Sequence, residues 1–365
     1  MQKKAAAQRK PTLKDLAEQA GVSVGTASNV MAGRGGPSAE TVAHVFEVAR
    51  KIGYVANAAA RSLRSRRSRL VACLVPDITN RFYGVIVRAA EHVLREAGYT
   101  LLLVDTHNDT ERECELLLDV TRVGVDGVLF APGSESSGKL QQQIAQADVP
   151  LVILDRDIAP DRPSVKVDHF SGALKTANYL LDLGHRRIAL LFPSSHLRPA
   201  RERWHAFETA AAARGLGDAL ELVRIDTSSM DVAFSQCLAL FQQAAPPTAI
   251  FGLGTTLLAG ALKAARQTGR DIPGDLSVVC VGDTELAQVH TPELTTLTWN
   301  LQDLGRHAAR LLLAEMEPGI DPQGSPGATA HLMLTCELIL RESCAAVGTG
   351  AGRKPARGRA KRLAS

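Results

Sequence analysis

The stretch that decides the fold of the N-terminal part of the chain is TLKDLAEQAGVSVGTASNVM, residues 12–31. Thr12 and Asp15 have the spacing of a capping box, with aspartate in place of the commoner glutamate. Apolar residues then recur at helical intervals as far as Gly21, where a first helix is expected to end. Ser23 can cap a second helix, whose alanine and valine side chains fall on one side. The pattern predicts two short helices that meet across a tight turn.

A third helix is predicted from its N-cap, Ser38, to Gly53, where the chain can leave the helix in a left-handed conformation. Between these residues the apolar side chains follow the i, i+3, i+4, i+7 pattern of a helix with one buried face. Three short helices of this kind predict an all-α helix-turn-helix headpiece, a unit whose second helix enters the major groove of DNA.

The outward side of the second helix carries small side chains, which would let it approach base edges closely. Asn29 is the side chain there that can make a bidentate contact, and the geometry of that contact suits adenine. Hydroxyl groups that can donate to phosphates at the groove walls belong to Ser23, Thr26 and Ser28. The alternative is that a helix start rich in serine and threonine is only a cap, because short patterns of this kind recur by chance.

The segment NAAARSLR, residues 57–64, has a helical composition but only one large apolar side chain, Leu63. An isolated helix of this length is marginal in water, so it would gain order by docking on a partner. Leu63 between Arg61 and Arg64 has the composition of an apolar wedge that opens a minor-groove step while arginines neutralise phosphates.

The two ends of the chain are basic, although the net charge of its 365 residues is only +4. Residues 1–69 carry +9 and residues 345–365 carry +6, so the part between them carries −11. A basic module attached to an acidic body is typical of a protein in which one part binds nucleic-acid phosphates and the other part has to stay away from them. The tail at residues 345–365, rich in Gly, Ala and Arg, is interpreted as a disordered, solubilising segment.

Residues 12–64, which include TLKDLAEQAGVSVGTASNVMAG and IGYVANAAARSLR, resemble the headpiece and hinge helix of the lactose-repressor (LacI) family of bacterial transcription regulators. The likeness continues to about residue 342. It implies a homodimer on a pseudo-palindromic double-stranded operator, whose centre is kinked by paired hinge leucines. The implied DNA contacts are Val24, Gly25 and Asn29 to bases, Ser23, Thr26 and Ser28 to phosphates, and Asn57, Arg61 and Leu63 in the hinge.

Residues 70–344 alternate continuous apolar runs with helical patterns, which predicts parallel sheets covered on both faces. The expected strands cover residues 70–76, 100–105, 126–132, 150–155, 187–193, 249–253 and 276–281. A body of this length predicts two Rossmann-like α/β lobes that bind a ligand between them, at the carboxyl ends of the strands. The resemblance implies the same periplasmic-binding-protein-like body, with crossings between the lobes near Val167, near Thr298 and within residues 317–331.

The resemblance also implies an effector site in the cleft. Arg203 matches the family arginine that grips effector oxygens, and its guanidinium suits a carboxylate, a phosphate or a sugar diol. Asp155 matches a strand-end aspartate near the effector, and Tyr83 matches a position that carries a stacking ring in purine-binding members. The other effector-binding residues that we expect are Gly282, Asp283 and Trp299.

The chain departs from the family where sugar hydroxyls are usually held. Gly254 and Thr255 stand in place of Asn-Asp, Gly282 aligns with an effector-facing aspartate, and Trp299 occupies a position that is often polar. Fewer acceptors, an added indole and a retained arginine predict an effector less hydroxylated than a hexose, anionic and with a flat or apolar face. A sugar acid is the rival interpretation, and packing between the lobes is the alternative role of Trp299.

The sequence lacks the common catalytic motifs. Glycines stand at 252 and 254 but not at 257, so the dinucleotide fingerprint fails, and there is no G-x-S-x-G, Walker loop or H-E-x-x-H. His185 is expected at the surface or at a helix end rather than in catalysis. Asp155, Arg156 and Asp157 are interpreted as the edge of a ligand cleft rather than an acid pair.

The six cysteines are scattered without C-x-x-C pairs, which favours buried, reduced thiols over a metal site or disulfides. No apolar run approaches the ~20 residues of a membrane span, and the N-terminus is basic and polar. We therefore expect a cytoplasmic bacterial protein on the nucleoid, with no cofactor and no membrane partner.

The predicted function is that of a transcriptional regulator, a repressor of a catabolic or transport operon, homodimeric or tetrameric and controlled by a small metabolite. Two alternatives are a DNA-binding regulator whose cleft has lost its ligand, and a solute-binding protein or sugar-processing enzyme with the same body. The expected organisation is an N-terminal extension at 1–11, a helix-turn-helix domain at 12–56, a hinge helix and linker at 57–69, an effector-binding and dimerisation body at 70–344 and a tail at 345–365.

Overall fold

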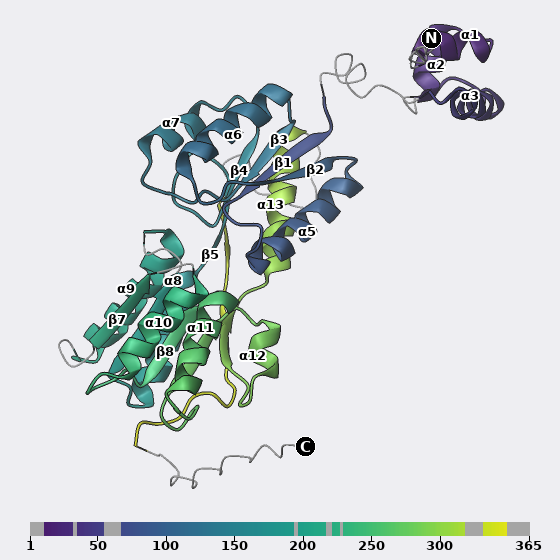
Figure 1. The fold of residues 1–365 in the computed structure, drawn as a ribbon. Helices are drawn as coiled ribbons and strands as arrows, with labels where there is room; N and C mark the ends of the chain where they lie inside the picture. Colours follow the sequence, from purple (N-terminus) through teal and green to yellow (C-terminus); the bar gives the residue numbers. More distant parts are fainter. Residues whose placement is uncertain are drawn as a thin grey trace, which may run out of the picture. The chain divides into compact units, whose positions relative to one another are not determined.

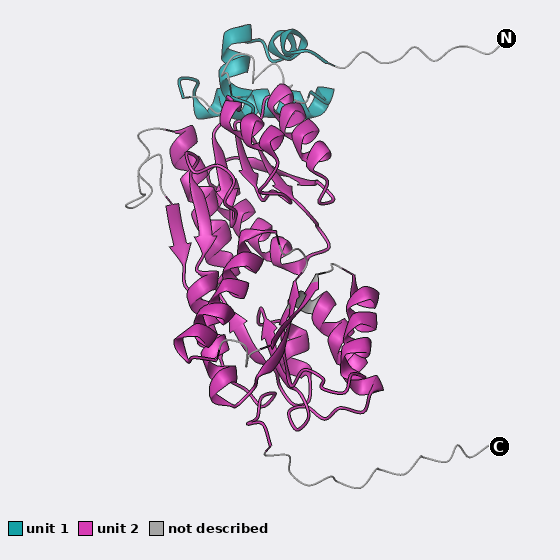
Figure 2. Ribbon diagram, turned by 90° about the vertical axis from the view of Figure 1, so that its left-hand side faces the viewer, with its two compact units in different colours: residues 1–69 teal, residues 70–365 magenta. Residues whose placement is uncertain are grey.

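Figure 1 shows the fold in a computed structural model, which describes residues 11–31, 35–54, 67–192, 196–216, 221–226, 229–317 and 331–348. The chain divides into two compact units, residues 1–69 and residues 70–365, which Figure 2 draws in two colours. Each unit encloses a hydrophobic core of its own, as expected of a domain.

The described helices of the first unit are α1 (Leu13–Gln19), α2 (Val24–Met31) and α3 (Ala39–Ile52). The predicted capping box is present, because the Thr12 hydroxyl accepts from the backbone N–H of Asp15 and the Asp15 carboxylate accepts from that of Thr12 at 2.7 Å. Ser38 caps α3, and Gly53 ends it in the left-handed region. The apolar faces of the three helices meet around Val45, which confirms the helix-turn-helix headpiece.

The first lobe of the second unit is built on a six-stranded parallel sheet of order β11-β5-β4-β3-β1-β2. Its strands are β1 (Leu70–Val75), β2 (Thr100–Asp105), β3 (Gly127–Phe130), β4 (Leu151–Leu154), β5 (Ser164–Val167) and β11 (His331–Leu334). The helices that pair on its two faces are α5 (Arg81–Glu96) with α13 (Leu301–Met316), and α6 (Thr110–Val123) with α7 (Gly138–Gln146). Alternate residues of β1 enter the two cores, Val71 on the α5 side and Leu74 on the α6 side. Both faces are buried, as the continuous apolar runs predict.

The second lobe has the sheet order β12-β10-β9-β8-β6-β7, in which β12 is antiparallel to β10 and the other pairs are parallel. Its strands are β6 (Arg187–Phe192), β7 (Glu221–Asp226), β8 (Ala249–Leu253), β9 (Ser277–Val281), β10 (Thr295–Thr298) and β12 (Glu337–Ile339). Its helices are α8 (His169–Asp182), α9 (Arg198–Ala213), α10 (Met230–Phe241), α11 (Gly254–Gln267) and the short α12 (Glu285–Val289). Leu190 of β6 joins the core under α8 and α9, whereas Leu191 joins the core under α10 and α11.

All seven predicted strands are present, with bounds that differ by at most two residues. Five strands were not predicted: β5, β7, β10, β11 and β12. Four of these strands are only three or four residues long, which is too short for a long apolar run. The fifth, β7, lies at the edge of its sheet and reads ELVRID, in which charged residues interrupt the apolar ones. Their pairing is decided by the neighbouring strand rather than by their own composition.

The chain crosses between the lobes after β5, near Val167, and after β10, near Thr298, as predicted. The prediction that the third crossing lies within residues 317–331 is wrong. Both α13 and β11 belong to the first lobe, because β11 pairs with β5. The chain passes to the second lobe between β11 and β12, at Thr335 and Cys336.

Of the two positions expected for His185, the helix end is confirmed and the surface position is wrong. The residue follows the end of α8, but it is only 3% exposed, and its ring nitrogens lie 2.8 Å from the Thr248 hydroxyl and 2.9 Å from the Ser277 hydroxyl. Burial lowers the pKa of His185 to about 4, so the ring is neutral near pH 7. It is a hydrogen-bonded part of the core.

The six cysteines are unpaired, and five of them are buried. In the part of the chain that the structure describes, no helix is both long and apolar enough to cross a bilayer. The same residues contain no cluster of three or more side chains suited to a metal ion.

Candidate functional site

The predicted recognition surface lies on α2. Ala27 and Val30 are buried, whereas Gly25 and Asn29 are exposed and Val24 is 46% exposed. A Cβ on Gly25 would meet only the Ser23 hydroxyl, at 3.6 Å, so the surface above this position is open. The arrangement leaves a shallow face of small residues with one longer polar side chain.

The hydroxyls on this segment also stabilise the helix. The Ser23 hydroxyl accepts from the backbone N–H of Thr26 at 3.0 Å and lies 2.8 Å from the Thr26 hydroxyl. Ser23 therefore does cap the helix, as the alternative proposes. This contact does not cover the exposed side of the helix. The expected hinge contacts, Asn57, Arg61 and Leu63, lie outside the described residues.

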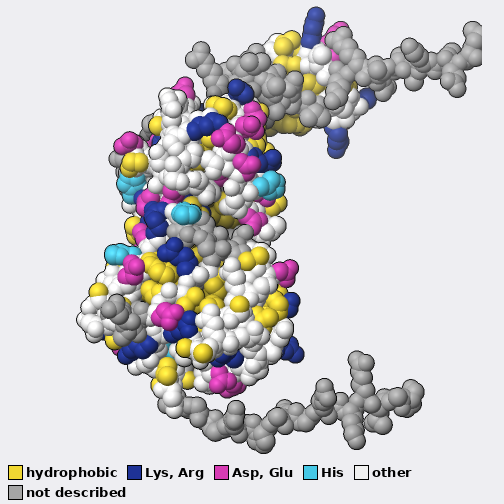
Figure 3. All heavy atoms as spheres, turned by 60° about the vertical axis from the view of Figure 1, so that its left-hand side comes forward, with side chains coloured by type: hydrophobic (Ala, Val, Ile, Leu, Met, Phe, Trp, Pro, Cys, Tyr) yellow, Lys and Arg dark blue, Asp and Glu magenta, His cyan; other side chains and the backbone are white. Residues whose placement is uncertain are grey.

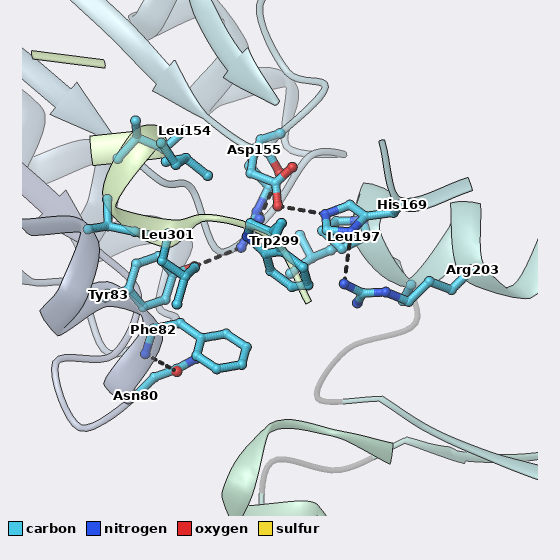
Figure 4. Close-up of a pocket in the computed structure, with 15 residues that line it drawn as sticks. Asn80, Phe82, Tyr83, Leu154, Asp155, His169, Leu197, Arg203, Trp299 and Leu301 are labelled. Carbon is cyan, nitrogen blue, oxygen red and sulfur yellow. Dashed lines mark hydrogen bonds and ion pairs between the residues drawn. The ribbon is translucent and has the colours of Figure 1, made fainter. Parts of the chain in front are cut away.

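A pocket with a volume of about 110 Å³ lies between the two lobes (Figure 4). The first lobe contributes residues of α5, α13 and the end of β4, and the second lobe contributes residues of α8 and α9. The lining includes four of the expected effector-binding residues: Tyr83, Asp155, Arg203 and Trp299. Its walls are mainly aromatic and aliphatic, and its polar groups come from a few side chains.

Asp155, His169 and Arg203 form a hydrogen-bonded chain along one wall (Figure 4). Arg203 Nη2 lies 2.8 Å from His169 Nδ1, and His169 Nε2 lies 2.8 Å from Asp155 Oδ2. Because a guanidinium can only donate, His169 Nδ1 accepts and its Nε2 carries the proton that it donates to Asp155. Burial lowers the pKa of His169 to about 4, which agrees with a neutral ring.

Asp155 follows β4 with φ of +53°, an uncommon conformation for a residue other than glycine. Its Oδ1 accepts from the backbone N–H of Val167 and from Arg198 Nη1, both at 3.1 Å. Burial works to raise the pKa of Asp155, but the hydrogen bond from His169 and the charge of Arg198 hold it below its usual value. Asp155 is therefore an ionised group that ties the first lobe to the second.

Arg203 is 1% exposed, and among the described residues no carboxylate lies within ion-pair distance of it. Its Nε and Nη1 have no hydrogen-bond partner. Burial lowers the pKa of Arg203 to about 10, so the group keeps its charge near pH 7. An unpaired buried cation is costly, so this position favours an anionic or oxygen-rich ligand.

Trp299 lies between the polar chain and an aromatic side chain from the other lobe. Its ring meets Phe82 edge to face at 5.8 Å and His169 at 5.2 Å between ring centroids. The Arg203 guanidinium carbon is 5.6 Å from the indole centroid. The indole Nε1 is buried and has no acceptor, so packing between the lobes accounts for the ring but not for its N–H group.

The Tyr83 ring lines the pocket, but its hydroxyl is already occupied. It accepts from Arg156 Nη2 at 3.0 Å, and Arg156 also donates to the carbonyls of Pro132 and Asp155, both at 2.8 Å. Tyr83 therefore presents an apolar surface to the pocket. Arg156 differs from Arg203, because each nitrogen of its guanidinium donates to an oxygen of the same wall.

Gly282 and Asp283 do not line this pocket. Gly282 has φ of +92°, and a Cβ there would lie 2.2 Å from Phe82 Cζ, so the Phe82 ring occupies the space beside it. The Asp283 carboxylate accepts from Arg341 at 2.7 Å and from Gln288 at 3.0 Å. The structure thus brings four of the six expected effector-binding residues together and places these two apart from them.

Ionic contacts that sequence analysis missed join the lobes beside the pocket. Glu135, in the loop after β3, accepts from the backbone N–H of Arg198 at 2.8 Å and from Arg201 at 2.5 Å. Arg198 also lies 3.4 Å from Asp157, and Arg81 pairs with Glu285. On the face drawn in Figure 3, side chains of both signs are interspersed over both lobes, so charge is not gathered there into one patch of a single sign.

His169, Phe82 and Glu135 were missed because their roles depend on how the two lobes meet. His169 is the first residue of α8, immediately after the crossing at Val167, and that position could have suggested it. Phe82 and Glu135 have no such sequence pattern.

Residues 12–57 match the family of bacterial regulatory proteins, lacI family, and residues 177–344 match the periplasmic binding protein-like domain. The HTH-type transcriptional regulator DegA of Bacillus subtilis is 30% identical over 344 residues, which are 93% of this chain and 100% of DegA. The ribose operon repressor of Halalkalibacterium halodurans is 30% identical over 335 residues, 91% of this chain and 96% of the repressor.

The crystal structure of the lac repressor dimer bound to operator and the anti-inducer ONPF has a TM-score of 0.81 and 24% identity, covering 93% of this chain and 100% of its own. This likeness shows the fold. The two sequence relatives are regulators of transcription rather than enzymes, and they match the headpiece and the body together. With one relative 30% identical along its whole length, the chain belongs to the LacI family of bacterial transcription regulators.

Proposed function

We propose that this DNA-binding transcriptional repressor controls a catabolic or transport operon and responds to a small anionic metabolite in the pocket between its lobes. The observation that carries the proposal is Arg203, a buried cation without an ion-pair partner among the described residues, set in the wall of the pocket between the lobes. Such a group favours a ligand that brings negative charge or several oxygen atoms.

The DNA-reading roles are assigned to α2 and the segment after α3. The exposed face of Val24, Gly25 and Asn29 supports base contacts, and Ser23, Thr26 and Ser28 are assigned to phosphates. The hinge roles of Asn57, Arg61 and Leu63 rest on the family resemblance. A homodimer on a pseudo-palindromic operator in the bacterial cytoplasm is part of the proposal, as is the division at residues 11, 56, 69 and 344.

The proposed mechanism is a coupling free energy between the pocket and the DNA-binding surface. A ligand that binds one relative position of the lobes more tightly than another shifts the population of those positions. In a dimer, this shift changes the spacing of the two linkers and so favours or disfavours the hinge helices on DNA.

One observation favours the alternative of a regulator without an effector. The Phe82 ring fills the space beside Gly282, where the family resemblance implies an effector-facing aspartate. Contact between the lobes at this point requires no ligand. The alternative therefore predicts operator binding that no small molecule changes.

The test is selection of bound duplexes from a random pool by the full-length protein at a stated salt concentration. Sugar acids, sugar phosphates, nucleobases and aromatic acids are added in turn. A palindromic site whose occupancy changes with one compound supports the proposal, and a site that no compound affects supports the alternative. The absence of any enriched site contradicts both.

The Asn29→Ala variant tests the base-reading role in the same assay. We expect it to lose about 1–3 kcal/mol of discrimination at one base per half-site, because a bidentate contact is removed. Gln19→Ala, an exposed change on α1, is the matched control and should select the parental site. Unchanged selection by Asn29→Ala would contradict the assignment of Asn29.

A further inference from the structure

We propose that the pocket between the lobes takes a small aromatic monocarboxylate of the benzoate class, with its carboxylate on Arg203 and its ring beside Trp299 and Phe82. This inference rests on the proposed function and names the ligand class of the same site.

The unpaired polar atoms in the wall are N–H donors. Arg203 Nε and Nη1 and Trp299 Nε1 are buried without a partner. The acceptors beside them are already engaged: Asp155 Oδ1 accepts two hydrogen bonds, and Asp155 Oδ2 and His169 Nδ1 accept one each. A sugar hydroxyl donates as well as accepts, whereas a carboxylate only accepts. A wall with free donors and engaged acceptors therefore suits a carboxylate better than a polyol.

The charge balance of the wall calls for one negative charge. The charged side chains that line the pocket are Asp155, Arg156 and Arg203, and His169 is neutral, so the wall carries one net positive charge. A dianion such as a phosphate ester would bring an excess charge into a mainly apolar site, and this is costly. A monoanion neutralises Arg203 and adds no excess.

The remaining wall is apolar and suits a flat ring. Phe82 and Trp299 meet edge to face, and Tyr83, Ile86 and Leu304 are among the other apolar residues of the lining. Aromatic groups gain from edge-to-face and offset contacts of this kind. The volume of about 110 Å³ is of the same order as the ~150 Å³ of a closed apolar cavity that holds benzene, and the pocket is partly open, so a ligand of one ring with its carboxylate is the largest that fits.

The first measurement is binding of benzoate to the full-length protein by isothermal titration calorimetry. Benzyl alcohol has a similar ring without the charge, cyclohexanecarboxylate has the charge without the flat ring, and gluconate is the sugar-acid rival. We expect benzoate to bind at least about tenfold more tightly than each of the three, because only benzoate satisfies both the charge and the ring. Tighter binding of gluconate than of benzoate would overturn the inference.

The chain has two tryptophans, which allows a second readout. Trp204 lies outside the pocket lining, with its Nε1 donating to Glu208 at 2.7 Å. The Trp204→Phe variant therefore reports fluorescence from Trp299 alone. We expect benzoate to change that fluorescence with the affinity measured by calorimetry, and an unchanged signal at saturation would place benzoate elsewhere.

Variants separate the role of Arg203 from a general loss of fold. Arg203→Met should weaken benzoate binding by about 10- to 100-fold, since a charged hydrogen-bonding partner is lost. Arg214→Lys, a change at an arginine that pairs with Asp182 outside the pocket lining, should bind as the parent does. Trp299→Phe keeps a ring and removes the indole N–H, and it should bind benzoate more weakly than the parent. Equal binding by the parent, Arg203→Met and Trp299→Phe would overturn the assignment.

Operator binding distinguishes this inference from the proposed function. If benzoate binds through Arg203 but leaves operator affinity unchanged, the ligand class is supported and the control of DNA binding by this pocket is contradicted. If a sugar acid changes operator affinity and benzoate does not bind, the proposed function is supported and the aromatic class is overturned.

Discussion

Gly282 follows β9, and two features require glycine at this position: its backbone conformation and the nearby Phe82 ring. Its φ is +92°, where side chains other than glycine are strained, and the Phe82 ring of the other lobe lies where a Cβ would be. The position at which the family resemblance implies a polar anchor is thus used for packing between the lobes.

Gly282→Ala should lower the free energy of unfolding by about 2–4 kcal/mol, from backbone strain and overpacking together. Denaturant unfolding of Gly282→Ala, Phe82→Ala and the double variant separates the two causes. Phe82→Ala should relieve the overpacking and leave the backbone strain, so the double variant should be more stable than the sum of the single changes implies. Strict additivity would show that the two residues do not interact.

His185 predicts a pH dependence of stability. Its pKa is lowered by burial from 6.5 to about 4, so between these values the unfolded chain binds the proton more readily than the folded chain does. The contribution of His185 is fully present above pH 6.5 and is lost as the pH falls toward 4, by up to about 3 kcal/mol. His169 shifts in the same direction, so the parent contains both contributions.

The measurement is the free energy of unfolding of the parent and of His185→Gln between pH 4 and pH 7.5. The variant should show a shallower fall below pH 6.5, since glutamine keeps a polar group near Thr248 and Ser277 but does not titrate. Parallel curves for the two proteins would mean that His185 does not titrate in this range.

At the scale of elements, α5 and α13 show how a close helix contact depends on one residue. A Cβ on Gly305 of α13 would lie 2.2 Å from the carbonyl oxygen of Ile86 and 3.0 Å from the Ala89 Cβ. The Ile86 carbonyl is part of the helix backbone and cannot move aside as a flexible side chain can. A side chain at Gly305 would therefore force α5 and α13 apart. The helix that returns from the second lobe is held against the first lobe at this point.

Gly305→Ala should therefore destabilise the protein by about 1–3 kcal/mol, although alanine is the better helix former. Gly84→Ala on α5 is the matched control, because a Cβ there meets nothing within 4 Å. That change should stabilise the protein by about 0.5–1 kcal/mol, the difference in helix propensity. Thermal unfolding of the two variants should show shifts of opposite sign, and two shifts of the same sign would contradict the contact.

The length and composition of single elements explain how much of the fold could be predicted from the sequence. Buried strands such as β1 and β9 have continuous apolar runs and were predicted, whereas β10 reads TTLT and depends on its neighbours for its identity. Arg203 and Asp155 were predicted because they match family positions. Phe82 and Glu135 could not be predicted, since their contacts arise only when the lobes meet.

At the scale of the whole second unit, ion pairs connect the two lobes in addition to the three chain crossings. Glu135, Asp155 and Asp157 of the first lobe face Arg198 and Arg201 of α9 in the second. The Glu135 side chain is 5% exposed, so its interaction is less screened than a surface ion pair. We interpret this network as a latch that favours the position of the lobes seen here.

Glu135→Gln should weaken the latch without a large change of volume. Hydrogen exchange of the first-turn amides of α9 is the readout, because the Arg198 N–H donates to Glu135 at 2.8 Å. We expect exchange there to be about 10- to 100-fold faster, as a charged hydrogen bond becomes a neutral one. Glu111→Gln, at an exposed pair with Lys139, is the control and should leave α9 unchanged. Unchanged exchange in Glu135→Gln would contradict the latch.

The strands β11 and β12 complete the two sheets, and they are joined by only two residues near the end of the body. During synthesis the helices of the headpiece are complete at residue 52, but the sheet of the first lobe lacks β11 until residue 334 has emerged and the sheet of the second lobe lacks β12 until residue 339 has emerged. At 5–20 residues per second, this interval is roughly 15 to 60 s. For that time the edges of β5 and β10 lack their last partners, a condition in which sheets are prone to pair wrongly. The nascent chain thus has the means to meet DNA before it has the means to sense a metabolite.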